Sequence, residues 1–160
     1  MGRVDDIVLT MKMVEEVEKY AMKLGVMKYD GGGWEWEEVV GSVTKKKGIY
    51  FLVSEYGIEK VGSARGKYGL RGRLQGYCRK KVDETKRDST DMLWERVMEG
   101  ELRGKRISVY CLEMDECIEE VETKMGVVRV EYVPVLEVEA YYFREARLRG
   151  EPMRLSGLSA

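Results

Sequence analysis

Basic side chains gather in one stretch of this 160-residue chain, between residues 60 and 81. The stretch contains no acidic residue and eight cationic ones: Lys60, Arg65, Lys67, Arg71, Arg73, Arg79, Lys80 and Lys81. The net charge of the whole chain is only −1, so a local basic surface indicates binding of a phosphate-bearing partner such as nucleic acid. The alternative is a solvated helix face whose charges meet acidic neighbours.

The side chains that are missing restrict the chemistry further. The chain contains no histidine, which excludes Ser-His-Asp and Cys-His catalysis, the histidine-dependent nuclease folds and nearly all zinc hydrolase sites. Its three cysteines, Cys78, Cys111 and Cys117, lack C-x-x-C spacing, so we expect free thiols in a reducing compartment. Any proton transfer must therefore use other side chains.

Two strands joined by a tight turn are predicted just before the basic stretch. Residues 48–54 (GIYFLVS) and 58–64 are rich in β-formers, and Glu55-Tyr56-Gly57 supplies the turn. Leu70, Leu74 and Cys78 share one helical face, which predicts a helix over residues 70–80. The basic stretch therefore begins on a hairpin and continues onto a helix.

The rest of the chain alternates between helical and strand patterns. Helices are predicted over residues 90–99 and 136–149, and strands over residues 106–112 and 127–133. The order predicts a small α+β domain with a mostly antiparallel sheet flanked by helices. Residues 4–24 carry apolar side chains at three- and four-residue spacing, which is typical of an amphipathic helix. We therefore divide the chain into an N-terminal helical extension, residues 1–45, and a main domain, residues 46–160.

The hairpin and the helix after it resemble the opening motifs of the GIY-YIG nucleases. Gly48-Ile49-Tyr50 begins the first strand, and Lys60-Val61-Gly62 follows ten residues after Tyr50, where the family has its YIG strand. The next helix contains Arg73-Leu74 and Tyr77, which is similar to the excision-repair members of the family. The resemblance implies that Arg73 is the catalytic arginine, with Arg71 as its nearest competitor and Tyr77 as its helix partner.

The family also has a glutamate on a late helix that is followed by a proline. In this chain Glu139 lies near the start of the last predicted helix, and Pro152 lies 13 residues beyond it. The resemblance therefore implies that Glu139 is the metal ligand, with Glu137 and Glu145 as alternatives. The matching motifs span residues 48–152.

Two positions depart from the family pattern. Lys60 replaces the YIG tyrosine, as in some restriction enzymes of the family, and an ammonium group is a compact cation that suits developing phosphate charge. The family's asparagine after the proline is absent, because Leu155 stands there and Ser156 follows. One supporting hydrogen bond of the family is therefore missing.

The activity that the resemblance implies is metal-dependent hydrolysis of a DNA phosphodiester bond. Glu139 would hold Mg²⁺ or Mn²⁺, since Mg²⁺ accepts one carboxylate and keeps several waters. Arg73 offers a planar fork that matches phosphate oxygens. Tyr50 would be the general base for the attacking water, with Lys60 favouring its phenolate form and contacting the phosphate. Tyr77 would hold water or orient Tyr50.

We therefore expect an endodeoxyribonuclease that cuts double-stranded DNA, as a restriction enzyme and as a homodimer. A DNA repair or mobile-element nuclease is the sister hypothesis. The alternatives from other classes are a catalytically inactive nucleic-acid-binding module with the same fold and an interaction protein with a chance pattern. The expected DNA contacts come from the basic stretch: Arg65, Lys67, Arg71, Arg79, Lys80 and Lys81.

Two further expectations concern where the protein works. No apolar run approaches the roughly 18 residues of a membrane span, and the first residues lack an apolar signal core, so we expect a cytoplasmic protein. The chain has no asparagine and one glutamine but many lysines, arginines and glutamates. That bias indicates a thermophilic host.

Overall fold

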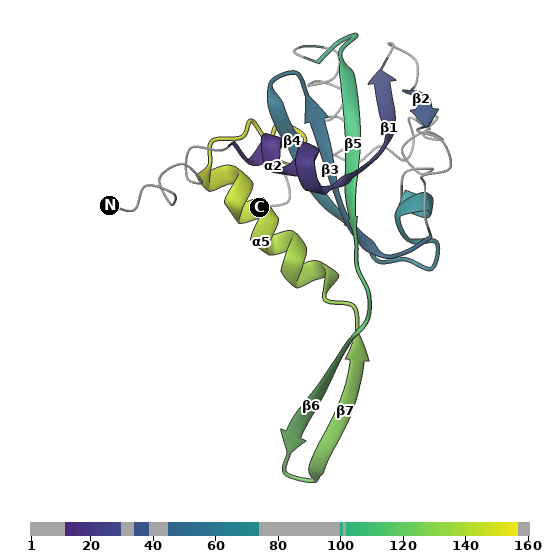
Figure 1. Ribbon diagram of the computed structural model, residues 1–160, viewed down its shortest axis with the longest axis vertical. Coiled ribbons are helices and arrows are strands. Elements are labelled where there is room, and N and C mark those ends of the chain that lie inside the picture. The colour runs from purple at the N-terminus through teal and green to yellow at the C-terminus, as the bar shows by residue number, and fades with distance from the viewer. Residues whose placement is uncertain (1–11, 30–33, 39–44, 74–99, 101, 157–160) are drawn as a thin grey trace, which may run out of the picture.

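A computed structural model describes residues 12–29, 34–38, 45–73, 100 and 102–156 of the chain. Its centre is a five-stranded sheet with the order β2-β1-β5-β3-β4, in which every neighbouring pair is antiparallel (Figure 1). The strands of this sheet are β1 (Met22–Tyr29), β2 (Trp34–Glu38), β3 (Gly48–Ser54), β4 (Gly57–Ala64) and β5 (Arg106–Glu113). Strands β6 (Cys117–Thr123) and β7 (Gly126–Tyr132) form a separate hairpin.

Strand β3, which lies between β5 and β4, divides the core into two layers. All seven of its residues are buried, and successive side chains of a strand point to opposite faces. Ile49, Phe51 and Val53 therefore pack with residues of α2 (Met13–Tyr20) and α5 (Val135–Leu148) on one face. Tyr50 and Leu52 pack on the other face, with the buried Leu70 and Leu102 among their neighbours. Because both faces of β3 are covered, its sequence GIYFLVS is a nearly continuous apolar run and does not alternate between apolar and polar residues.

The predicted α+β fold with a mostly antiparallel sheet is confirmed. The hairpin appears as β3 and β4, and the strands predicted over residues 106–112 and 127–133 appear as β5 and β7. The last predicted helix appears as α5. Residues 69–73 are helical, whereas the rest of the helix predicted over residues 70–80 and the one over 90–99 lie outside the described residues. No helix in the described part of the chain is long and apolar enough to cross a membrane.

The predicted N-terminal extension is not helical throughout. It contains the strands β1 and β2, and the prediction is wrong in that respect. The described helix ends at Tyr20, and β1 then runs from Met22 to Tyr29 and pairs with β5. The pairing shifts register between Lys23 and Gly25, so Leu24 and Met27 enter the same core although they lie three residues apart. This bulge reproduces the spacing of a helix. A domain boundary near residue 45 stays a prediction, although β1 belongs to the same sheet as β3.

The C-terminal segment 151–156 covers the outer edge of β4. Met153 donates a backbone hydrogen bond to Ile58 O at 2.9 Å, and Leu155 donates one to Glu59 O at 2.9 Å. An unpaired sheet edge would otherwise expose its backbone groups. The segment therefore occupies backbone acceptors along the edge strand β4 without forming a strand itself.

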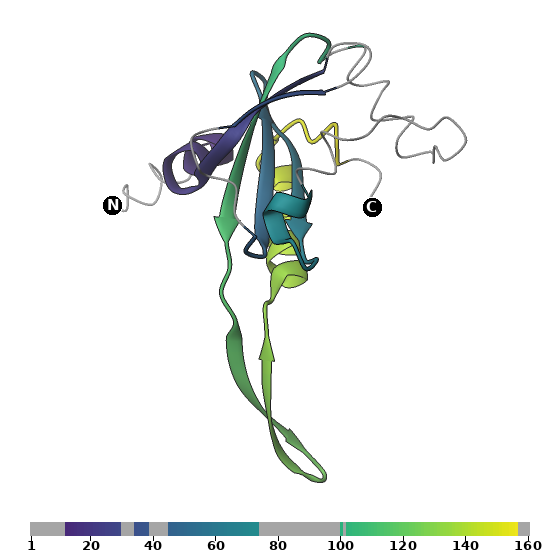
Figure 2. The same cartoon turned by 90° about the vertical axis from the view of Figure 1, so that its right-hand side faces the viewer.

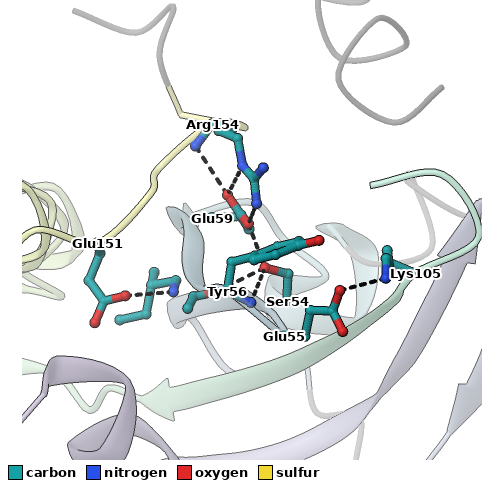
Figure 3. A network of polar contacts seen from close by, with 9 residues as sticks. Ser54, Glu55, Tyr56, Glu59, Lys105, Glu151 and Arg154 are labelled. Atoms are coloured by element: carbon teal, nitrogen blue, oxygen red, sulfur yellow. Dashed lines mark hydrogen bonds and ion pairs between the residues drawn. The ribbon is translucent and has the colours of Figure 1, made fainter. Parts of the chain in front are cut away.

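A buried ion pair fixes this segment to the hairpin (Figure 3). The Glu59 side chain is completely buried, and Arg154 donates from Nε to its Oε1 at 2.9 Å and from Nη2 to its Oε2 at 2.5 Å. Ser54 also donates to Glu59 Oε2 at 2.5 Å. The Arg154 guanidinium lies 4.8 Å from the centre of the Tyr56 ring. A charge buried in this way is tolerable only because each of its oxygens is hydrogen-bonded.

Replacing Arg154 with methionine is expected to lower the free energy of unfolding by about 2–3 kcal/mol, because Glu59 loses its counter-charge. The loss is smaller than for a fully enclosed pair because the Arg154 side chain is 23% exposed. Urea denaturation measures it. The control is Lys105→Met, which removes the exposed Lys105–Glu55 pair and should leave stability unchanged. Equal stability of the two variants would contradict a structural role for the buried pair.

Candidate active site

A cleft of about 460 Å³ lies along β4, between the sheet, the helical residues 69–73 and α5. Three cations and one carboxylate line it, namely Lys60, Arg65, Arg73 and Glu139. The other lining residues are Tyr50, Val61, Gly62, Ser63, Leu136, Ala140, Phe143 and Ser156. A concave site with an excess of positive charge suits an anionic substrate.

Tyr50 reaches the cleft from strand β3, next to the edge strand β4. Its side chain is completely buried in the layer of the core that also holds Leu52. Tyr50 pairs with Gly62 on β4, and a side chain at position 62 would overlap the phenol ring and its oxygen. The glycine therefore leaves the space through which the Tyr50 hydroxyl extends to the edge of the sheet. The strand thus holds the buried ring in place at the wall of the cleft.

Arg73 approaches the same hydroxyl from the helical residues 69–73. Its Nε donates a hydrogen bond to the Tyr50 hydroxyl at 3.3 Å. Gly69 has a φ of +55°, and a side chain there would overlap the carbonyl oxygens of Lys45 and Lys46. Leu70 is completely buried and donates from its N–H to Lys46 O at 2.9 Å. The sharp turn at Gly69 and the buried Leu70 thus anchor the segment that directs Arg73 toward Tyr50.

Glu139 enters the cleft from the second turn of α5. Its Oε2 accepts a short hydrogen bond from the Ser63 hydroxyl on β4, which fixes the carboxylate against the edge of the sheet. No cluster of three or more carboxylate or thiol side chains that could hold a metal occurs among the residues that the structure describes. A lone carboxylate such as Glu139 would suit a cation that keeps most of its waters, as Mg²⁺ does.

The cleft brings together four of the five predicted catalytic residues: Tyr50, Lys60, Arg73 and Glu139. The fifth, Tyr77, lies outside the described residues. The alternative residues Arg71, Glu137 and Glu145 do not line the cleft. Their positions make them useful matched controls for Arg73 and Glu139.

The predicted DNA contacts fall into four groups. Arg65 lines the cleft itself. Lys67 lines a shallower depression that continues from it past Ser63 and Arg73. Arg71 is exposed but lines neither of these two hollows, and the predicted contacts Arg79, Lys80 and Lys81 lie outside the described residues.

Two serines of the cleft were not among the predicted site residues. Ser63 follows Gly62 on β4, and its partner on α5 could not be inferred from local sequence. Ser156 is buried, and its hydroxyl oxygen accepts a hydrogen bond from the Val61 N–H at 3.2 Å. Leu155, in the place of the family's asparagine, is buried in the core. The residue after it, Ser156, is therefore the one that reaches the cleft.

Two solved structures are similar to this chain. A mutant of bacteriophage T4 EndoII matches with a TM-score of 0.54 and 17% identity, covering 89% of this chain and 98% of that chain. The restriction endonuclease HPY188I in complex with product DNA matches with a TM-score of 0.51 and 15% identity, covering 98% of this chain and 91% of that one. The chain shares their fold. No protein-family model and no curated protein matches its sequence.

Proposed function

We propose that the protein is a metal-dependent DNA endonuclease of the GIY-YIG type. The observation that carries the proposal is the convergence of Tyr50, Arg73 and Glu139 on one cleft from three separate parts of the chain. A binding surface alone would not need a buried tyrosine whose hydroxyl meets an arginine at 3.3 Å. The fold shared with a restriction endonuclease in complex with product DNA supports the same activity.

Phosphodiester hydrolysis needs a deprotonated water, relief of phosphate charge and a stabilised leaving oxygen. Glu139 is the residue that would hold a divalent cation, and Ser63 holds one of its carboxylate oxygens in place. When bound, such a cation supplies Lewis-acid stabilisation of phosphate charge. Lys60 and Arg65 add positive charge along the same cleft, where they would orient the DNA backbone.

Tyr50 is the proposed general base. Tyr50 lines the cleft, where its hydroxyl would meet a water that also contacts a bound phosphate. Arg73 donates a hydrogen bond from Nε to this oxygen, so the guanidinium holds the phenol in place beside the other cations of the cleft. The guanidinium also lines the cleft, where it would contact phosphate oxygens. The same side chain would therefore orient the base and bind the substrate.

The proposed substrate is double-stranded DNA, and the proposed role is that of a restriction endonuclease that works as a homodimer. The cleft contains one proposed base and one proposed cation ligand, Tyr50 and Glu139. One such site cuts one strand, so cutting both strands at a symmetric sequence requires two copies related by a two-fold axis. The DNA complex of the similar restriction endonuclease supports this choice of substrate.

The deciding experiment is cleavage of supercoiled plasmid and mixed-sequence linear DNA with Mg²⁺, with Mn²⁺ and with EDTA. We expect discrete fragments that require the metal. Arg73→Ala should slow cleavage by roughly 10²–10³-fold, the usual effect of losing one donor to a developing charge. Its matched control is Arg71→Ala, two residues away and outside the cleft, which should cleave within a few-fold of wild type.

Other outcomes have distinct meanings. If the DNA is nicked or degraded to a smear, and this requires the metal and Arg73, the protein is a nuclease but not a restriction endonuclease. Salt-sensitive DNA binding without cleavage under any metal or temperature would contradict the catalytic proposal and leave a binding module. Equal losses in Arg73→Ala and Arg71→Ala would contradict the assignment of Arg73.

A further inference from the structure

The hairpin formed by β6 and β7, called the arm below, extends beyond the sheet and both helices (Figures 1 and 2). Its two strands pair with each other and with no other described strand. Apart from the partly buried Tyr132, every residue from Cys117 to Tyr132 is exposed. Each strand has seven residues and so spans roughly 20 Å at about 3.4 Å per residue. An isolated two-stranded hairpin is only marginally stable in water, so an arm of this length calls for a partner.

The register of the arm separates its side chains into two faces. Val121 lies opposite Val128, Glu119 opposite Val130, and Cys117 opposite Tyr132. Directly paired residues of an antiparallel ladder share a face. The valine face of the arm therefore consists of Cys117, Glu119, Val121, Thr123, Val128, Val130 and Tyr132. The charged face consists of Ile118, Glu120, Glu122, Val127, Arg129 and Glu131.

The two faces differ in charge. The valine face carries one ionised group, Glu119. The Tyr132 hydroxyl donates a hydrogen bond to the Glu119 carboxylate across the strands, and this raises the pKa of Tyr132. The side chains of Val121, Val128 and Val130 are 42%, 48% and 37% exposed, which is unusual for three adjacent valines. The charged face holds three glutamates, and one of them pairs with Arg129 at 3.7 Å. Only the valine face can be covered without burying several charges.

The net charge of the arm excludes DNA as the group that covers it. Between Cys117 and Tyr132 there are four glutamates and two basic residues, Lys124 and Arg129. The segment leading into the arm adds Glu113, Asp115 and Glu116. A ribbon with this excess of acidic groups is repelled by phosphates. A protein surface with an apolar centre and a basic group near its end would complement the valine face and its glutamate.

We propose that the valine face of the arm packs against the valine face of a second copy of this chain. The face is self-complementary when two arms cross antiparallel about a two-fold axis at the Val121–Val128 pair. Glu119 lies on one side of this pair, and Lys124 lies at the turn on the other side. The two-fold axis therefore brings Glu119 of each copy near the partner's Lys124, with the valines between them. Such an isologous contact closes as a dimer.

The arm also connects the dimer to the cleft. Its second strand ends at Tyr132, and α5 begins at Val135 with Leu136 and Glu139 lining the cleft. Pairing of the arms would fix the spacing between two clefts, which is what a double-strand cut needs. This functional consequence rests on the proposed function, whereas the oligomeric state does not. A single hairpin face is small beside the roughly 800 Å² per partner of a standard interface, so we expect a weak dimer.

The test is sedimentation velocity of the full chain from about 1 to 200 µM, which brackets the micromolar dissociation constant of a small interface. We expect wild type to shift from monomer to dimer over this range. Val128→Lys places a charge on the valine face and should raise the dissociation constant at least about tenfold. The matched control is Val127→Lys, the same change one residue away on the charged face, which should dimerise as wild type does. Both positions are exposed, so circular dichroism should show unchanged folding.

A charge exchange tests the two-fold geometry. Glu119→Lys and Lys124→Glu should each weaken the dimer, and the double variant should restore most of the lost affinity because the attraction across the axis returns. A wild type that stays monomeric over the whole range overturns the proposal. So does a Val128→Lys variant that dimerises as well as Val127→Lys. Neither result depends on DNA cleavage, so failure of the arm proposal and failure of the proposed function remain distinguishable.

Discussion

Glu139→Gln is expected to lower the rate of DNA cleavage by about a thousandfold or more while leaving the fold intact. A bound cation that stabilises phosphate charge contributes several kcal/mol, and each 1.36 kcal/mol corresponds to about tenfold in rate. Glutamine keeps the size of the side chain and can still accept the hydrogen bond from Ser63. It removes the negative charge that a divalent cation requires. The loss should therefore be chemical and not structural.

The matched control for this prediction is Glu137→Gln, because Glu137 lies on the same helix but is exposed and outside the cleft. We expect Glu137→Gln to cleave within a few-fold of wild type. Calorimetric titration with Mn²⁺ gives a second readout, in which Glu139→Gln alone should lose binding. If Glu139→Gln were fully active, Glu139 could not be the essential ligand of the cation, and other residues would have to hold it. Equal loss in both variants would indicate a general charge effect.

The parts of the site that the sequence predicts best are those linked by short-range geometry. A tight hairpin fixes which residues of its strands face each other, so Tyr50 and Lys60 had to lie on adjoining strands a few residues from the turn. Their pairing with Gly62 and Leu52 follows directly. Arg73 and Glu139 lie far apart in the chain, and it was the resemblance that linked them. Their convergence depends on how α5 packs against the sheet, which no local pattern determines.

Three features were predicted wrongly or were not predicted from the sequence, each for a physical reason. The helical spacing of apolar residues continues through Val17 and Ala21 to Leu24, so a helix was predicted over residues 4–24 although α2 ends at Tyr20 and β1 begins at Met22. Strand β6 is exposed along its whole length, so it lacks the alternation of a strand that buries one face. Its glutamates resemble a solvated charge run. The Glu59–Arg154 pair joins residues 95 positions apart, a distance over which sequence patterns carry no information.

Tyr50→Phe is expected to slow cleavage by about 10²–10⁴-fold, the usual contribution of a positioned general base. Phenylalanine keeps the ring that fills the buried space above Gly62, so the sheet should pack as before. The change removes the oxygen that would take the proton of water and also the acceptor for Arg73 Nε. Binding of DNA should change little, because the remaining cations of the cleft stay in place. The expected result is therefore a lower cleavage rate with a nearly unchanged affinity for DNA, and both should be measured.

The pH dependence separates a base from a structural tyrosine. Hydroxide needs no general base, so the deficit of Tyr50→Phe relative to wild type should narrow as the pH rises. The control is Tyr110→Phe on β5, where burial and, to a lesser degree, Glu18 raise the pKa of a tyrosine that does not line the cleft. It should keep the wild-type rate and profile. If Tyr50→Phe were as active as wild type at every pH, the proton would have to go elsewhere, and Tyr77 would be the next tyrosine to replace. A constant deficit at every pH would instead reduce Tyr50 to a residue that positions Arg73.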